Sequence, residues 1–285
     1  MLENKKILPP LWLAYPEIAR YSIGWRMGYG EDYIYQWNEW FRTLSLEEQS
    51  TYEKQFPEPP MWKGFWRDTD DCIYYHKNFE IPFWQKEGVP KYSLEQIQKD
   101  YRSGKKLEYC MFWRVQPTLS GTVNKGCLSQ WYPSSFFSIV TTYCCMEQYM
   151  MAYKAELFGD NEIKNQILSC RDPKKIKALG QKVRNFDEVV WGKIKYSIVL
   201  NGNYMKFSQN PKLKDFLLKT GDKILVEASP YDNIWGIKME ESNQFAQNPL
   251  KWRGQNLLGF ALMEVRDTIR EVYKNEHLTQ PITSN

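Results

Sequence analysis

The sequence predicts a soluble α+β protein that is mainly helical and carries a small sheet. Its 285 residues can bury one large core or two modest ones without help from a disulfide or a metal ion. Hydrophobic residues make up 42% and charged residues 25% of the chain, which is the balance of a globular protein. Capped helical segments recur, whereas only a few short runs have the composition of strands. These three observations together indicate the α+β class.

The first 113 residues form a predicted N-terminal extension, because they hold eight of the 12 Trp residues and those rings need burial. Helices are expected at three places within it: 31–43, 45–55 and 93–102. The last two open with the capping-box patterns of Ser45 and Ser93. Residues 107–113 have a strand-like composition. We place a domain boundary near 105–125 and expect the extension to pack against the rest of the chain.

The second predicted domain covers residues 125–273 and carries stronger helical signals. Its expected helices are 143–158, one opened by Asp172-Pro173, one opened by Asn210-Pro211, and 257–273. Its expected strands are 223–229 and 235–239. Gly159 and Gly221 mark two helix ends.

Composition argues against several functional classes. With only two histidines, His76 and His277, serine-histidine triads and multi-histidine metal sites are not expected. GxGxxG and P-loop patterns are absent from the sequence. The net charge of +4 is too small to indicate a dedicated nucleic-acid-binding protein. We therefore expect no cofactor and no metal, which leaves carboxylate and lysine chemistry for catalysis.

Cysteine usage and hydropathy give an expected location. The six cysteines contain no CxxC pair, and Cys144 and Cys145 are adjacent, which fits reduced thiols. No run of 18 apolar residues and no leader with a cleavage site are present. We expect a cytoplasmic protein that makes no membrane contact.

One pair of charged residues is a candidate site. Glu147 and Lys154 are seven residues apart on the helix expected over 143–158, so they project from nearly the same, largely apolar face. Buried together they would point to function, because an unpaired buried charge is costly. On a partly exposed face they would be ordinary solvated charges, and spacing alone leaves both interpretations open.

Other polar positions also have two interpretations. Asp232 lies in a polar turn between the two expected strands and fits a turn-capping aspartate. Asn256 precedes the last helix and fits an N-cap. Trp131, Trp235 and Trp252 fit either a core or a surface that stacks on planar ligands.

Five segments form an ordered pattern: Cys127–Pro133, Tyr143–Ala155, Leu217–Ser229, Tyr231–Ile237 and Trp252–Arg266. They include E-x-Y-x4-K on a helix, followed later by D-x2-W-G and N-x-L-G. This combination resembles the NADAR (YbiA-like) family of ADP-ribose-recognising N-glycosidases. The resemblance covers about half of the chain and implies a mainly helical α+β domain.

The resemblance also implies an activity and site residues. It implies removal of ADP-ribose from guanine bases carried by DNA, RNA or a nucleotide, with ADP-ribose as the product. Lys154 resembles the catalytic amine, which would form an imine with the opened sugar, and Glu147 and Asp232 resemble its acid/base partners. For the substrate pocket it implies Ser129, Gln130, Trp131, Tyr149, Trp235, Gly236 and Asn256.

Two departures from the family pattern affect substrate choice. Gln130-Trp131 stands where the family usually has Asn-Phe, and Ile237 replaces an acidic residue of the branch that acts on riboflavin-pathway intermediates. Because the acidic residue of that branch is missing, we prefer the ADP-ribose activity, while the Gln130-Trp131 departure leaves the shape of the pocket entrance open. The alternatives are a glycosidase for riboflavin-pathway intermediates and a non-catalytic ADP-ribose or NAD sensor.

Overall fold

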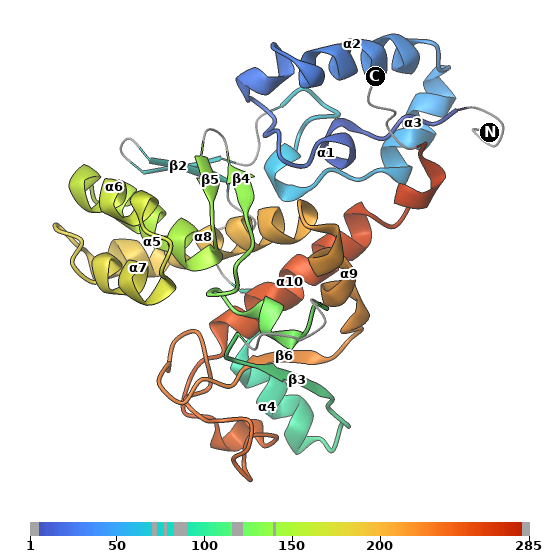
Figure 1. Ribbon diagram of the computed structural model, residues 1–285. Coiled ribbons are helices and arrows are strands. Elements are labelled where there is room, and N and C mark those ends of the chain that lie inside the picture. Colours follow the sequence, from blue (N-terminus) through green and yellow to red (C-terminus); the bar gives the residue numbers. More distant parts are fainter. Residues whose placement is uncertain are drawn as a thin grey trace.

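The computed structural model describes residues 6–69, 73–76, 79–82, 90–115, 122–138 and 141–280. It confirms the α+β class, with helices predominating and strands confined to short two-stranded pairs. Figure 1 shows the N-terminal elements gathered at one end, two long helices through the middle, and the β3-β6 pair near the other end. No helix within the described residues is long and apolar enough to cross a membrane.

The N-terminal extension is built on an aromatic cluster. Its elements are α1 (Leu11–Ala14), η1 (Ile23–Trp25), α2 (Tyr29–Arg42), α3 (Leu46–Gln55) and η2 (Pro60–Trp62). Trp12 is almost fully buried and its ring lies 5.5 Å from that of Trp62 and 5.3 Å from that of Trp66. The expected capping box is present: Ser45 accepts a hydrogen bond from the Glu48 amide, and Glu48 accepts one from the Ser45 amide. The Trp-rich sequence thus forms a compact core made of packed aromatic rings.

The chain between the extension and the second half supplies strands and one helix. These elements are β1 (Ile73–His76), β2 (Phe79–Pro82), α4 (Leu94–Arg102) and β3 (Tyr109–Phe112). Strands β1 and β2 pair antiparallel. Strand β3 pairs in parallel with β6 (Ile224–Glu227), so that Phe112 lies opposite Glu227. A segment of residues 1–113 is therefore hydrogen-bonded into the core of the second half.

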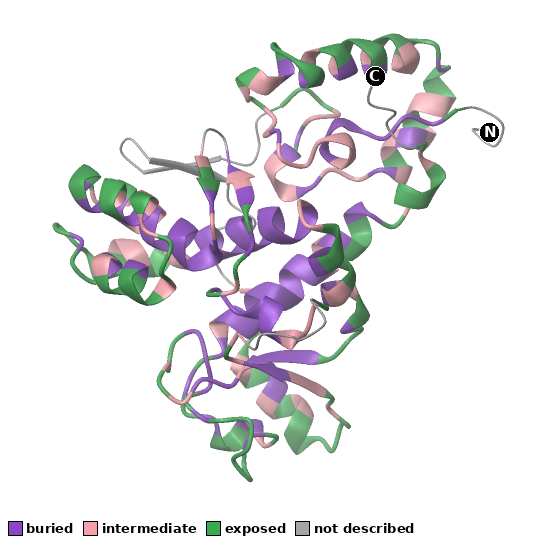
Figure 2. Ribbon diagram, in the orientation of Figure 1, coloured by how far each residue is buried: buried purple, intermediate pink, exposed green. Residues whose placement is uncertain are grey.

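The second half is helical around two buried helices. Its elements are η4 (Lys125–Leu128), β4 (Phe136–Ser138), β5 (Thr141–Tyr143), α5 (Met146–Leu157), α6 (Asn161–Ser169), α7 (Pro173–Gly180), α8 (Glu188–Ser208), α9 (Pro211–Lys219), β6, η5 (Pro249–Lys251), α10 (Leu257–Val272) and η6 (Glu276–Leu278). Figure 2 shows α8 and α10 buried along most of their length. α10 contacts α8, α9 and β6, which places these two helices at the centre of the core.

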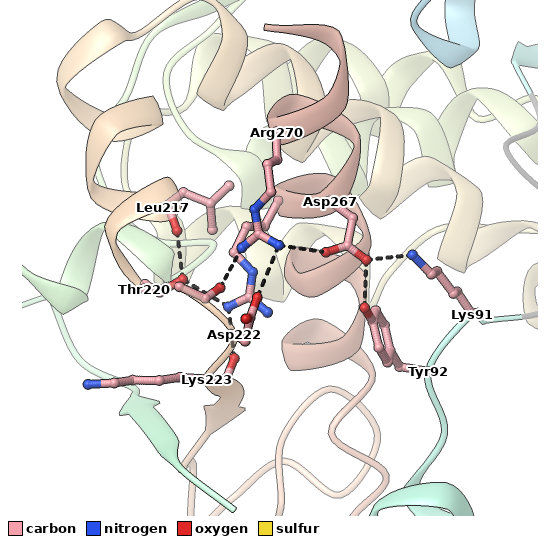
Figure 3. Close-up of polar contacts among 10 residues, drawn as sticks. Lys91, Tyr92, Leu217, Thr220, Asp222, Lys223, Asp267 and Arg270 are labelled. Carbon is pink, nitrogen blue, oxygen red and sulfur yellow. Dashed lines mark hydrogen bonds and ion pairs between the residues drawn. The ribbon is translucent and has the colours of Figure 1, made fainter. Parts of the chain in front are cut away.

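Contacts across the fold confirm that the extension packs on the second half. Asn275 donates its side-chain amide to the Gln55 carbonyl at 2.8 Å, and the Gln280 amide bonds the Ile7 carbonyl at 3.0 Å. In Figure 3, Asp267 of α10 accepts hydrogen bonds from Lys91 and Tyr92. These contacts tie the C-terminal half of α10 and the segment after it to residues of the extension.

Three expected elements differ from the structure. Residues 235–239 form no strand: Ile237 and Met239 bond the backbone of Glu227 and Ser229, but Lys238 has a φ of 52° and turns the chain. The helix expected from residue 143 starts at Met146, because Thr141–Tyr143 pairs with β4 instead. Asn210 precedes α9 without a side-chain cap, since its amide bonds the carbonyls of Ser135 and Lys206.

Candidate active site

A cavity of about 1040 Å³ opens beside the carboxyl end of β6. It is bounded by the segment after β3, the loop after η4, the residues before α5, helix α7 and the turn after β6. The lining residues that carry polar or aromatic groups include Trp113, Arg114, Ser129, Trp131, Arg171, Lys174, Lys177, Glu227, Tyr231 and Asp232. The parts come from both halves of the sequence, so only the folded chain assembles this cavity.

Glu147 lies in the first turn of α5 and is almost fully buried, with 3% of its surface exposed. Its Oε2 accepts a hydrogen bond from the indole Nε1 of Trp131 at 3.2 Å, whereas its Oε1 has no partner. Burial raises the pKa of the Glu147 carboxyl to about 7; Asp232 adds to the increase, while Lys177 and the Trp131 bond oppose it. A carboxyl group with this pKa exchanges protons readily at neutral pH.

Glu227 ends strand β6 and lines the cavity. Its Oε2 is buried without a partner. Burial, followed by the charges of Asp232 and Glu147, raises the pKa of Glu227 to about 8. Glu227 was not among the site residues predicted from the sequence. It could have been recognised as a carboxylate that directly follows the buried apolar run Ile224-Leu225-Val226. A residue in this position is the last of its strand and lies at the edge of the sheet.

Asp232 has both of the roles considered for it. Its Oδ1 accepts hydrogen bonds from the amides of Ile234 at 2.9 Å and Trp235 at 2.7 Å, so it caps the turn. The same residue lines the cavity, and its charge raises the pKa of both Glu147 and Glu227. The three carboxyl groups therefore act on one another electrostatically.

Lys154 lies away from the cavity and from the Glu147 carboxyl group. Its Nζ donates to the Gly180 carbonyl at 2.9 Å and lies 4.2 Å from the centre of the Phe186 ring. Burial lowers the pKa of its amine. Seven residues of helix separate the two side chains by about 10 Å along the axis, so a shared face does not bring their ends together. Lys177 of α7 is the amine that lines the cavity, and its charge lowers the pKa of both glutamates.

The side chains of the loop after η4 lie in two places: some line the cavity and one is buried in the core. Ser129 and Trp131 line the cavity. Gln130 is buried behind them, where its carbonyl accepts the Glu147 amide at 3.0 Å and its Nε2 lies 3.9 Å from the Met150 sulfur. Tyr149 is buried at 1% exposure against the rings of Phe136, Tyr143 and Tyr153 and does not line the cavity.

Three other expected pocket residues lie behind β6. Asn256 accepts the Glu227 amide at 3.0 Å and donates to the Leu225 carbonyl at 2.9 Å. It occupies the N-cap position of α10, as expected, but its side chain bonds the backbone of β6 and makes no cap hydrogen bond on the helix. Gly236 is packed so closely that a Cβ atom there would lie 2.8 Å from the Glu227 carbonyl oxygen. Trp235 is buried and does not line the cavity. These residues hold the strand that carries Glu227.

Lys206 is a buried residue that the sequence analysis did not single out. From the middle of the core, its Nζ donates to the carbonyls of Cys127 at 2.6 Å and Ser129 at 3.0 Å. Burial lowers the pKa of this amine to about 8. It could have been recognised as a lysine in the second half of α8, where almost every residue is buried and the helix has no exposed face. Lys206 fixes the backbone that presents Ser129 and Trp131.

Comparison with known proteins identifies the family. The model described as the NADAR domain matches residues 111–270, more than half of the 285 residues. The chain belongs to the NADAR family. This NADAR chain is 47% identical over 144 residues to an N-glycosidase of Acanthamoeba polyphaga mimivirus, a match that covers 49% of this chain and 85% of the relative.

More distant relatives carry two kinds of name. An N-glycosidase of Nostoc punctiforme is 31% identical, with 52% of this chain and 87% of the relative covered. A riboflavin biosynthesis protein of Vibrio vulnificus is 29% identical over 52% of this chain and 36% of its own length. The solved structure of Escherichia coli YbiA is 22% identical, covers 63% of this chain and 96% of its own, and has a TM-score of 0.45. The names of the mimivirus and Nostoc relatives support an N-glycosidase of the NADAR family.

Proposed function

We propose that this chain is an N-glycosidase that removes ADP-ribose from guanine bases carried by nucleic acid or by a nucleotide. The observation that carries the proposal is a pair of carboxyl groups with raised pKa values: Glu227 lines the cavity, and Glu147 is buried directly behind its wall, bonded to the lining residue Trp131. Cleavage of a glycosidic bond uses such a pair, one to donate and one to accept a proton. The names of the relatives support the glycosidase class, and the departure at Ile237 favours ADP-ribose.

The two glutamates suit different steps. With a pKa of about 8, Glu227 holds a proton at neutral pH and can deliver it to the departing base as the bond between the anomeric carbon and nitrogen breaks. With a pKa of about 7, Glu147 is partly ionised and can take a proton from the water whose oxygen bonds to that carbon. The carboxylate of Asp232 stabilises the positive charge that develops on the sugar.

A lysine route is the second mechanism for the same cavity. A neutral amine would attack the anomeric carbon, displace the base and form an imine with the opened sugar, which water then hydrolyses. The family pattern assigns this amine to Lys154, whereas Lys177 is the lysine next to the glutamates. We therefore propose Lys177 as the nucleophile in that route and keep Lys154 as the alternative candidate.

Turnover on defined substrates tests the function. The full chain is incubated with an oligonucleotide and with a nucleotide that carry ADP-ribosylated guanine, and free ADP-ribose is measured by chromatography. We expect many turnovers, and Glu227→Gln is expected to reduce kcat at least 100-fold. Binding without turnover would identify an ADP-ribose sensor. Release of ribose 5-phosphate from phosphorylated riboflavin-pathway intermediates, with no action on ADP-ribosylated guanine, would identify the activity named for the Vibrio relative.

Borohydride added during turnover separates the mechanisms. An imine on Lys177 or Lys154 would be reduced to a stable adduct that mass spectrometry locates on the corresponding peptide. Lys177→Ala and Lys154→Ala provide the comparison, and Lys175→Ala is the matched control because Lys175 lies on α7 but outside the cavity. If the substrate is cleaved at the normal rate and no lysine adduct forms, the result supports the mechanism that uses the glutamates and water.

A further inference from the structure

Three cations at the cavity have no acidic partner. Arg114, Arg171 and Lys174 all line it, and no hydrogen bond or ion pair joins their side chains to any residue that the structure describes. Elsewhere Lys125 pairs with Glu241 at 2.6 Å and Lys214 with Glu276 at 2.8 Å. All three residues are exposed, and a single unpaired cation is ordinary on a surface. Three that line one cavity from two separate segments form a positively charged wall that can bind an anion.

An aromatic pair lies beside these cations. Trp113 and Tyr231 have ring centres 5.8 Å apart, and both line the cavity. Tyr231 is 79% exposed, which is unusual for a ring that has a neighbouring aromatic partner. The Arg114 guanidinium lies 4.2 Å from the centre of the Trp113 ring. An exposed ring next to a positively charged group suits a planar base attached to a phosphate.

From these contacts we propose that Arg114, Arg171 and Lys174 bind the two phosphoryl groups of a nucleoside diphosphate, and that Tyr231 stacks on a ring of the same molecule. Two guanidinium groups can each contact phosphoryl oxygens with two hydrogen bonds. A single phosphate would leave part of this charge unpaired. The inference rests on the proposed function and deepens it, because it selects a diphosphate-linked sugar over a sugar monophosphate as substrate.

The size of the cavity agrees with this choice. Cavities for drug-sized ligands measure roughly 300–1,000 Å³, and this one measures about 1040 Å³. It has room for a sugar at the carboxyl groups together with a diphosphate and a second ring. The cations and Tyr231 then account for the part of the substrate that does not react, which contributes binding energy to the reaction.

Calorimetric titration of the full chain tests the assignment. The probes are ADP-ribose, AMP, inorganic pyrophosphate, inorganic phosphate and an unmodified oligonucleotide, which offers phosphodiesters but no diphosphate. We expect ADP-ribose to bind at least tenfold more tightly than AMP, and pyrophosphate more tightly than phosphate. Tight, steeply salt-dependent binding of the oligonucleotide with weak binding of pyrophosphate would instead assign the cations to a nucleic-acid backbone and overturn the proposal.

Variants of matched charge locate the contacts. Arg171→Gln and Lys174→Gln are each expected to weaken ADP-ribose and pyrophosphate binding about tenfold. Lys175→Gln is the control, since it removes the same charge from the same helix outside the cavity. Tyr231→Ala is expected to weaken ADP-ribose about tenfold while leaving pyrophosphate unchanged.

Two results would overturn the inference, and both differ from failure of the proposed function. Unchanged ADP-ribose binding in Arg171→Gln and Lys174→Gln would remove the phosphoryl assignment. An equal loss of ADP-ribose affinity in Lys175→Gln would show that the overall charge of the protein, and not contact at the cavity, determines the binding. If ADP-ribose binds as described but modified guanine is not cleaved, the diphosphate site stands and the glycosidase proposal fails.

Discussion

At the scale of single residues, the chemistry of the cavity depends on two carboxyl groups: Glu147 is buried behind its wall, and Glu227 is half-buried at its edge. Glu147 and Glu227 each retain one buried oxygen without a partner, although such an atom costs free energy that a hydrogen bond would recover. Among the residues that the structure describes, no ion pair neutralises them, and the charge of Lys177 only partly offsets their burial. Unsatisfied carboxyl oxygens at a cavity are what a proton-transferring site requires before substrate arrives.

The pH dependence of kcat/KM follows from these two groups. Because Glu147 must be ionised and Glu227 protonated, pKa values of about 7 and about 8 predict a narrow bell-shaped profile with its maximum between them. Glu147→Gln should remove the acidic limb and Glu227→Gln the alkaline limb, measured with the same substrate from pH 5 to 10. A flat profile across this range would contradict the assignment of both residues.

Stability should also respond to Glu227. Folding raises its pKa from 4.5 to about 8, so the folded state favours the protonated form. The contribution of Glu227 to the free energy of unfolding is fully present below pH 4.5 and is lost as the pH rises towards 8. Glu227→Gln, a neutral side chain of the same shape, should therefore be more stable than the natural protein at pH 8.5 by roughly 1–3 kcal/mol, and equal to it at pH 4. Urea unfolding at the two pH values measures this difference.

At the scale of elements, the sequence predicted those helices that carry a local signal. Capping residues and apolar stripes identified α2, α3, α4, α7, α9 and α10 close to their observed bounds. α8 was missed because it is buried on nearly every side, and a helix without a polar face has no amphipathic stripe. Residues 235–239 have strand composition, but the left-handed conformation of Lys238 depends on contacts with β6 that no local pattern records.

The candidate site was predictable to a similar degree. Glu147, Asp232, Ser129 and Trp131 were nominated, and all lie at or directly behind the cavity. Glu227 and Lys177 were not, because only the pairing of β6 and the packing of α7 bring them together. The catalytic roles of these residues, and the division into domains, stay predictions.

Asn256 shows how an element is held in place. It has a φ of 55°, which costs most residues about 1–2 kcal/mol, and it bonds the backbone on both sides of Val226. Asn256→Ala should lower the free energy of unfolding by about 2–4 kcal/mol and reduce activity, since Glu227 is the residue it anchors. Asn256→Gly, which tolerates this φ, separates strain from lost hydrogen bonds. If both variants unfold like the natural protein in urea, the anchoring role is wrong.

At the scale of the whole molecule, the extension and the NADAR domain share one body. The family match begins at residue 111, yet β3, the Lys91-Tyr92 segment and Gln55 at the end of α3 all bond residues of the second half. Helix α10 connects these regions, because its Asp267 reaches Lys91 and Tyr92 while Arg270 bonds Asp222 and the Gly221 carbonyl (Figure 3). A chain connected in this way should unfold as one unit.

Calorimetry of two matched variants tests that expectation. Asp267→Ala removes the acceptor for Lys91 and for the half-buried Tyr92, so we expect a loss of about 1–2 kcal/mol, which lowers Tm by roughly 2–6 °C for a chain of this size. Asp222→Ala also removes a carboxylate near Arg270, but Asp222 is 93% exposed, and exposed ion pairs contribute about 0–1 kcal/mol. Its Tm should change little. In the natural protein and in both variants a single transition is expected, with equal calorimetric and van't Hoff enthalpies. If Asp267→Ala splits the transition in two, the extension and the domain fold independently and the contacts of α10 do not couple them.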